Sequence, residues 1–117
     1  MQALLKAWQN SSAGFRHAVA CERAVRQEFY ALVAALPLAF LVGADNWKRA
    51  LLIGSVLLVL AVELLNTAIE KLCDHVTPQI HPTIKVVKDM GSAAVLAAIF
   101  AAGLLWLAAL SDRIGWL

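Results

Sequence analysis

The sequence predicts an all-α membrane protein in which an N-terminal surface helix is followed by three transmembrane helices. Apolar residues make up 62% of the 117 residues, charged residues 15%, and the mean hydropathy is +0.74. Soluble domains are about half apolar, and a soluble bundle can bury one wholly apolar helix at its centre but not three. This chain has three apolar runs, at 29–44, 50–69 and 90–111. We expect residues 1–117 to form a single membrane domain.

The first element, residues 4–27, differs from the apolar runs because it is amphipathic. Its apolar residues can share one face of a helix, with an interruption near residues 10–14, and its arginines lie on the other face. The apolar set is Leu4, Leu5, Trp8, Phe15, Val19 and Val25, and the basic set is Arg16, Arg23 and Arg26. An ordinary soluble amphipathic helix has the same pattern, but three spans follow at once. We therefore expect a helix that lies in the membrane interface.

The three spans are expected at about 28–47, 50–70 and 90–111. A transmembrane helix needs roughly 20 apolar residues, so the second and third runs are long enough, and the first must borrow residues at its ends. Pro37 lies inside the first run, where membrane helices tolerate proline. Aromatic belts form at membrane surfaces, and all four tryptophans fall near predicted span ends: Trp8, Trp47, Trp106 and Trp116.

The positive charges predict the orientation of the chain. Seven of the ten Lys and Arg residues lie in the N-terminal stretch and the second loop: Lys6, Arg16, Arg23, Arg26, Lys71, Lys85 and Lys88. The positive-inside rule therefore favours a cytoplasmic N-terminus and a periplasmic C-terminus. The net charge of +2 gives no sign of a nucleic-acid partner.

Acidic residues interrupt the second apolar run. Glu63, Asn66 and Glu70 are spaced i, i+3 and i+7, so they share one face of a helix, and Asp74 extends the row. Glu63 lies roughly 10 Å deeper than Glu70 at ~1.5 Å per residue. An intramembrane carboxylate costs at least ~2.5 kcal/mol and is a functional candidate by default. The row leads from water toward the lipid headgroups, as a site that joins a water-soluble reactant to a lipid requires.

Other polar residues can join this row at the cytoplasmic surface. Glu22 lies in the amphipathic segment, and Lys88 and Asp89 stand where the third span enters the membrane. Carboxylates from separate segments suit Mg²⁺, which usually binds one or two carboxylates and phosphate oxygens. For Glu70 and Asp74 simple solvation at a helix end is an equal alternative; for Glu63 it is not. A phosphate-binding G-x-x-x-x-G-K-[ST] loop is missing from the sequence, so any nucleotide is held in another way.

Three blocks resemble the signature of the bacterial integral-membrane diacylglycerol kinases: ERAVRQE (22–28), VELLNTAIEKLCD (62–74) and KDMGSAAVL (88–96). The resemblance covers nearly the whole chain, and undecaprenol kinases share much of the signature. It implies a homotrimer in a bacterial cytoplasmic membrane, with sites composed between subunits. The implied reaction moves the γ-phosphate of MgATP to the primary hydroxyl of diacylglycerol, giving phosphatidic acid.

The resemblance also implies roles for individual residues. Glu63 would be the general base, and Glu22 and Glu70 the Mg²⁺ ligands. Residues implied at the nucleotide and its metal are Asn10, Glu22, Asn66, Glu70, Gln79, His81, Lys88 and Asp89. Residues implied at the lipid are Ser11, Ser12, Arg16, Arg26, Gln27, Glu28, Arg49, Glu63 and Ser92. The stretch 75–87 departs from the family pattern, because Pro78 and Pro82 stand where a helix-compatible polar loop is expected.

Two functions of other classes compete with a lipid kinase. A small proton-coupled transporter would use Glu63 as a proton site but does not need Glu22 or the Lys88–Asp89 pair. A structural membrane subunit does not need Glu63. The combination of these residues favours the kinase, with undecaprenol as the alternative acceptor.

Overall fold

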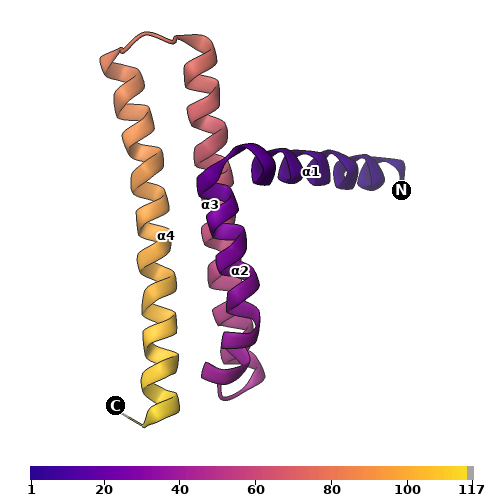
Figure 1. Ribbon diagram of the computed structural model, residues 1–117, viewed down its shortest axis with the longest axis vertical. Helices are drawn as coiled ribbons and strands as arrows, with labels where there is room; N and C mark the ends of the chain where they lie inside the picture. Colours follow the sequence, from indigo (N-terminus) through magenta and orange to yellow (C-terminus); the bar gives the residue numbers. More distant parts are fainter. Residues whose placement is uncertain (116–117) are drawn as a thin grey trace.

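The computed structural model describes residues 1–115, which form four α-helices. They are α1 (Gln2–Cys21), α2 (Arg23–Val42), α3 (Asn46–Val76) and α4 (Pro82–Ile114). The predicted all-α class is confirmed, and α2, α3 and α4 are each long and apolar enough to cross a membrane. These three helices run alongside one another, while α1 projects sideways from them (Figure 1). Trp116, assigned above to an aromatic belt, lies outside the described residues.

The N-terminal helix ends earlier than predicted. α1 is continuous through residues 10–14, so the interruption there concerns the apolar face and not the helix, and α1 ends at Cys21 rather than at the predicted residue 27. Glu22 has an extended backbone (φ −115°, ψ 115°) and separates α1 from α2. Residues 23–27 belong to α2 because Val25 is fully buried, packed with Ala18 of α1 and Leu60 of α3. Burial of this valine fixes where the chain turns from α1 into the bundle.

The first two spans are shifted relative to the predicted 28–47 and 50–70. α2 begins at Arg23 and continues through Pro37 to Val42. α3 begins at Asn46, because the side chain of Asp45 accepts the backbone N–H of Lys48 at 2.9 Å and caps the helix. Asp45 therefore caps α3 and Asn46 is the first residue of α3, so neither residue belongs to the first span.

The second loop is much shorter than the sequence suggested. α3 continues to Val76, and α4 begins at Pro82 rather than near residue 90. The proline stands in the first turn of α4, where a missing N–H costs nothing, and His81 caps the helix by accepting the N–H of Thr83 at 3.2 Å. Counting only apolar residues underestimated both helices, since their polar ends continue beyond the apolar runs.

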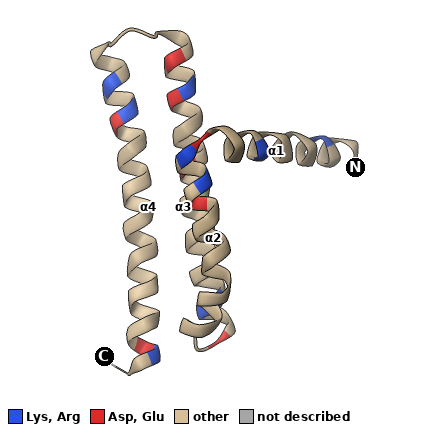
Figure 2. Ribbon diagram, in the orientation of Figure 1, with Lys and Arg blue, Asp and Glu red and all other residues tan. Residues whose placement is uncertain are grey.

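α3 is the central helix of the chain. It buries seven residues, Leu52, Ser55, Val59, Leu60, Glu63, Asn66 and Cys73, whereas α4 buries only Ala109. The charges of α4 lie toward its two ends, and its long middle carries none (Figure 2). Most of the apolar surface of α4 therefore faces surroundings that this single chain does not supply.

Polar contacts join the helices at the end of the bundle that is distant from the α3–α4 loop. Lys48 of α3 pairs with Asp112 of α4, and the indole N–H of Trp106 donates to Ser55 Oγ at 3.2 Å. Arg49 donates from Nε to the carbonyl of Gly43 at 3.1 Å. These contacts hold the start of α3 and the end of α4 in place relative to each other.

Candidate active site on the C-terminal half of the central helix

Glu63 is a carboxylate held inside the bundle at the start of the polar row on α3. The residue is only 8% exposed even in the isolated chain. Its Oε1 accepts a hydrogen bond of 3.5 Å from the hydroxyl of Thr67, one turn later. Glu70 and Glu28 are near enough for their charges to act on it. No Lys or Arg among residues 1–115 forms an ion pair with Glu63, so its charge is not neutralised within the part of the chain that is described.

Asn66 connects the row to the facing helix. Its Nδ2 donates to Oε1 of Glu70 at 3.2 Å, which orients that carboxylate. Its Oδ1 is buried, and none of the described residues donates a hydrogen bond to it. This oxygen lies against Gly91 of α4, in the space that a Cβ at position 91 would occupy. The missing side chain of Gly91 therefore gives Asn66 the room to hold Glu70.

Glu22 reaches the same region from the α1–α2 junction. Its carboxylate does not cap α2, and Nζ of Lys71 on α3 lies 2.7 Å from its Oε1. Its side chain is 21% exposed, whereas that of Lys71 is 65% exposed. Since Lys71 directly follows Glu70, this ion pair brings Glu22 toward the end of the row that carries Glu70.

The loop between α3 and α4 closes around a cavity of about 250 Å³. Its lining residues are Asp74, Thr77, Pro78, Gln79, Ile80, His81, Ile84, Lys85, Lys88 and Asp89. Four of the eight residues implied at the nucleotide are among them, although the loop departs from the family pattern. Ligand pockets usually measure ~300–1,000 Å³, so this cavity can take part of a nucleotide rather than the whole.

Ion pairs hold the charged residues of this cavity. Nζ of Lys88 lies 2.6 Å from Oδ1 of Asp74, and Nζ of Lys85 lies 2.7 Å from Oδ2 of Asp89. All four side chains are at least one-third exposed. Exposed pairs of this kind contribute ~0–1 kcal/mol, so an incoming phosphate can displace the acids from the lysines at little cost.

The residues implied at the lipid are dispersed. Ser12 and Arg16 line a separate cavity of about 480 Å³ on α1 with Trp8, and Arg16 bonds within α1 to the carbonyl of Ser12. Arg49 lies at the other end of α3, roughly 20 Å along the helix from Glu63. Of the others, Ser11, Gln27 and Ser92 are exposed, and Arg26 and Glu28 are half-buried on α2. Asn10, implied at the nucleotide, is exposed on α1. The single chain does not bring these residues together.

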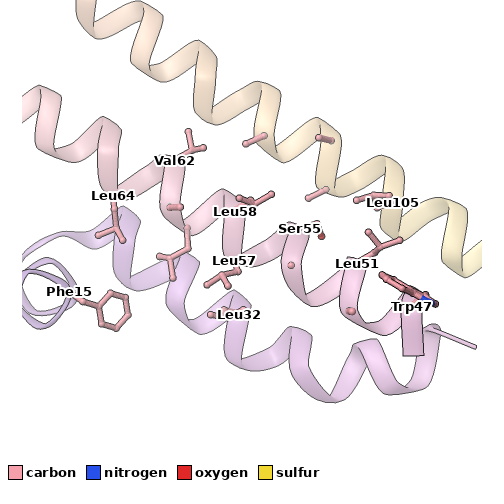
Figure 3. A pocket seen from close by; sticks show the side chains of 17 residues that line it. Phe15, Leu32, Trp47, Leu51, Ser55, Leu57, Leu58, Val62, Leu64 and Leu105 are labelled. Carbon is pink, nitrogen blue, oxygen red and sulfur yellow. The ribbon is translucent and has the colours of Figure 1, made fainter. Parts of the chain in front are cut away.

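A long apolar groove of about 1,000 Å³ runs along α3 (Figure 3). It extends from Trp47 to Leu64 of α3, with Phe15 of α1, Leu32 of α2 and Leu105 of α4 at its sides. Its lining includes the small residues Ala50, Gly54, Ser55, Ala61, Ala98, Ala101 and Ala102. Small residues allow helices to approach closely in membranes.

Two residues of the site were missed by the sequence analysis. Lys71 was used only to predict orientation, although a cation directly after Glu70 was a visible signal. Gly91 stands inside the third block of the signature, but nothing in the sequence indicates that Asn66 lies against it.

The oxygen ligands in this region suit a magnesium ion, but one chain does not supply a complete set of them. Glu22 and Glu70 offer carboxylate oxygens, and Asn66 adds a buried amide oxygen without a donor among the described residues. Hard oxygen ligands of this kind are those that Mg²⁺ prefers, and it commonly retains waters and phosphate oxygens. Within residues 1–115, no group of three or more His, Cys, Asp or Glu is close enough to hold a metal. A metal held here would need further ligands from a substrate, from water or from another chain.

Comparisons with known proteins give a matching family and several similar proteins. The family "Prokaryotic diacylglycerol kinase" matches residues 9–110. The diacylglycerol kinase of Escherichia coli K12 is 42% identical over 112 residues, which cover 96% of this chain and 92% of the relative. That of Pseudomonas aeruginosa is 42% identical over 106 residues (91% and 86%), and that of Haemophilus influenzae is 36% identical over 103 residues (88% and 87%). This chain therefore belongs to the prokaryotic diacylglycerol kinase family.

Proposed function

We propose that the protein is a diacylglycerol kinase of a bacterial inner membrane. It transfers the γ-phosphate of MgATP to the primary hydroxyl of diacylglycerol and releases phosphatidic acid and ADP at the cytoplasmic surface. The curated relatives named above are diacylglycerol kinases, which favours diacylglycerol over undecaprenol as the acceptor. Membership of a kinase family also argues against the transporter and the structural subunit.

The position of Glu63 carries this proposal. It is a buried carboxylate in an apolar helix, and the polar row on its face leads through Asn66 and Glu70 to the cavity at the α3–α4 loop. From Glu63 to Asp74, at the edge of that cavity, α3 rises roughly 16 Å. A hydroxyl that stays at the membrane surface and a nucleotide that stays in water can meet along such a row.

Each part of the row has a role in the transfer. Glu63 accepts the proton of the lipid hydroxyl. At the same time the hydroxyl oxygen forms a bond to the γ-phosphorus, and the bond from that phosphorus to the ADP oxygen breaks. Glu22 and Glu70, with Asn66 orienting Glu70, would hold Mg²⁺, which when bound neutralises charge on the phosphates. Lys88 exchanges Asp74 for a phosphate oxygen. Phosphoryl transfer depends mainly on such positioning and charge neutralisation.

The same helices place the protein in the membrane. With the N-terminus and the α3–α4 loop in the cytoplasm, α1 projects along the membrane surface and exposes Leu4, Leu5 and Trp8, as an interfacial helix requires. The end of the bundle that carries Lys48 and Asp112 then lies at the periplasmic side.

The active unit in this proposal is a homotrimer. The apolar groove along α3, with its small residues, suits the close approach of a helix from a second copy of the chain. The metal donors of one chain are incomplete and the predicted lipid residues are dispersed, which also supports sites composed between subunits.

The test is a kinase assay on the purified protein in mixed micelles, with γ-labelled ATP and Mg²⁺. Diacylglycerol and undecaprenol are offered in parallel, and the labelled lipid product is quantified. We expect labelled phosphatidic acid, dependent on Mg²⁺. Preferential labelling of undecaprenol would change the acceptor, and no labelled lipid from either would reject the lipid-kinase function.

A further inference from the structure

We infer that Lys71 is a resident counter-ion of the metal site: its ammonium group occupies the Glu22 carboxylate while Mg²⁺ is absent and must leave when Mg²⁺ binds. The inference rests on the proposed function, because it takes Glu22 as a metal ligand. It gives a role in setting metal affinity to a residue that the transfer itself does not use.

The geometry selects Glu22 among the acids within reach of Lys71. Asp74 lies three residues further along α3, on the same side of the helix, but its carboxylate is paired with Lys88 at 2.6 Å. Lys71 instead crosses to the α1–α2 junction, where its Nζ lies 2.7 Å from Glu22 Oε1. The contact is therefore between two separate segments and not a local pair along one helix.

The two partners differ in their freedom to move. Glu22 is fixed by its position between two helices: its N–H bonds to the carbonyl of Ala18 at 2.8 Å, and its carbonyl accepts the N–H of Arg26 at 3.0 Å. Its side chain is mostly covered. Lys71 is largely exposed, and its long flexible chain can swing into water. When a second cation arrives, the lysine is the partner that moves.

A metal ion and the ammonium group cannot share Glu22 without cost. Magnesium binds oxygen at ~2.0–2.1 Å, so an ion bound to Glu22 would stand within a few ångströms of Nζ, and the two positive charges would repel each other. Metal binding at Glu22 therefore includes breaking the ion pair. Lys71 therefore weakens the affinity for Mg²⁺ by the free energy of the ion pair that must break. Once displaced, its ammonium group stays beside the site, where it can attract the phosphates of the nucleotide.

The test uses Mn²⁺ as a probe of the metal site, in the absence of nucleotide. Free Mn²⁺ is measured by electron paramagnetic resonance during titration of the full-length protein in detergent micelles. Lys71→Gln removes the charge, and should bind Mn²⁺ roughly two- to fivefold more tightly, the range expected for releasing one partly exposed ion pair. Lys71→Arg keeps the charge and should remain within twofold of the parent protein, on the order expected for a preserved pair.

Two further variants separate the explanations. Lys48→Gln makes the same change of net charge at the opposite end of α3 and should leave Mn²⁺ affinity unchanged. In a Glu22→Gln background, Lys71→Gln should have no further effect, because the two residues act through one contact. Equal Mn²⁺ affinity of Lys71→Gln and the parent, or equal tightening by Lys48→Gln, would overturn the inference.

The outcome also distinguishes this inference from the proposed function. A parent protein that binds Mn²⁺ at a site unaffected by Glu22→Gln removes Glu22 from the metal site, and the counter-ion role is lost with it. A site that depends on Glu22 but not on Lys71 leaves the proposed function intact and rejects the counter-ion alone.

Discussion

The two ends of α3 carry similar residue types but use them differently. At the end near residue 46, polar contacts join separate helices, as in the Lys48–Asp112 pair and the Trp106–Ser55 hydrogen bond. At the other end, Glu63 and Glu70 have no cationic partner among residues 1–115, and Asn66 has an oxygen without a donor there. The unpaired carboxylates of the row indicate where a substrate or metal is expected, and the pairs beside them, Glu22–Lys71 and Asp74–Lys88, are ones that a ligand would displace.

The largest effect is expected for Glu63→Gln, which keeps the size of the side chain but cannot accept a proton. It should lower kcat by ~10²-fold or more, the usual contribution of general acid–base catalysis, with little change in the KM for ATP. Folding should survive, since the variant removes an unneutralised buried charge. The matched control is Asp112→Asn at the opposite end, which should retain activity; near-normal turnover of Glu63→Gln in the same assay would exclude it as the base.

The second-largest effect on activity is expected from loss of a metal ligand. Glu70→Gln and Glu22→Gln should each raise the Mg²⁺ concentration needed for half-maximal activity, or abolish activity altogether. The measurement is a Mg²⁺ titration of initial rates at saturating ATP. If both variants keep the metal dependence of the parent protein, these carboxylates do not hold the ion.

Mixed oligomers test whether residues of two chains combine to form one active site. Glu63→Gln and Asp89→Asn chains, each inactive alone, should regain part of the activity when they are co-expressed. Activity is compared with that of the separately expressed variants after two-tag purification of mixed oligomers. Oligomers that demonstrably contain both chains and remain inactive would favour a site built within one chain.

A smaller loss of activity is expected from a substitution of Gly91 in α4. In Gly91→Ala the new Cβ would collide with Asn66 Oδ1, and the amide must rotate and release Glu70. We expect a loss of activity of roughly tenfold, within the range for displaced catalytic groups, with an increased Mg²⁺ requirement and little loss of stability. Gly103→Ala is the matched control, because nothing lies within 4 Å of a Cβ there. Equal activity of the two variants would show that Asn66 does not depend on Gly91.

The smallest effect is expected at the structural end. Trp106→Phe removes the donor to Ser55, and should lower the free energy of unfolding by about 0.6 kcal/mol, the average for such contacts between membrane helices. Activity should stay within about twofold, since the loss of one such bond leaves the helix in place. Thermal unfolding in micelles measures the first quantity and the kinase assay the second. A large loss of activity with unchanged stability would contradict the division between the two ends.

Part of this architecture follows directly from the sequence. The row of Glu63, Asn66 and Glu70 was predictable because the period of a helix is fixed, and the three apolar runs indicate the three spans although the first run is short. The start of α4 was not, because charged residues and Pro82 interrupt the apolar residues of 82–89, so this stretch does not form an apolar run.

Contacts between helices were the least predictable part of the site. The partner of Lys71 depends on the direction in which the chain turns at Glu22, and no Gly or Pro marks that turn. Arg49 was implied at the lipid by the resemblance, yet in this chain its side chain bonds to Gly43. Its role at the lipid stays a prediction that a single chain does not test.

The junction at Glu22 also limits how the chain can change in length. With one residue between α1 and α2 there is no slack to absorb an insertion. One residue added after Trp8 would turn the preceding part of α1 by about 100°, and would carry Trp8 away from its present side. Seven added residues would restore the phase to within about 20°. Insertions in α1 should therefore be tolerated in steps of seven and not singly, which a series of insertion variants assayed for membrane-dependent activity would reveal.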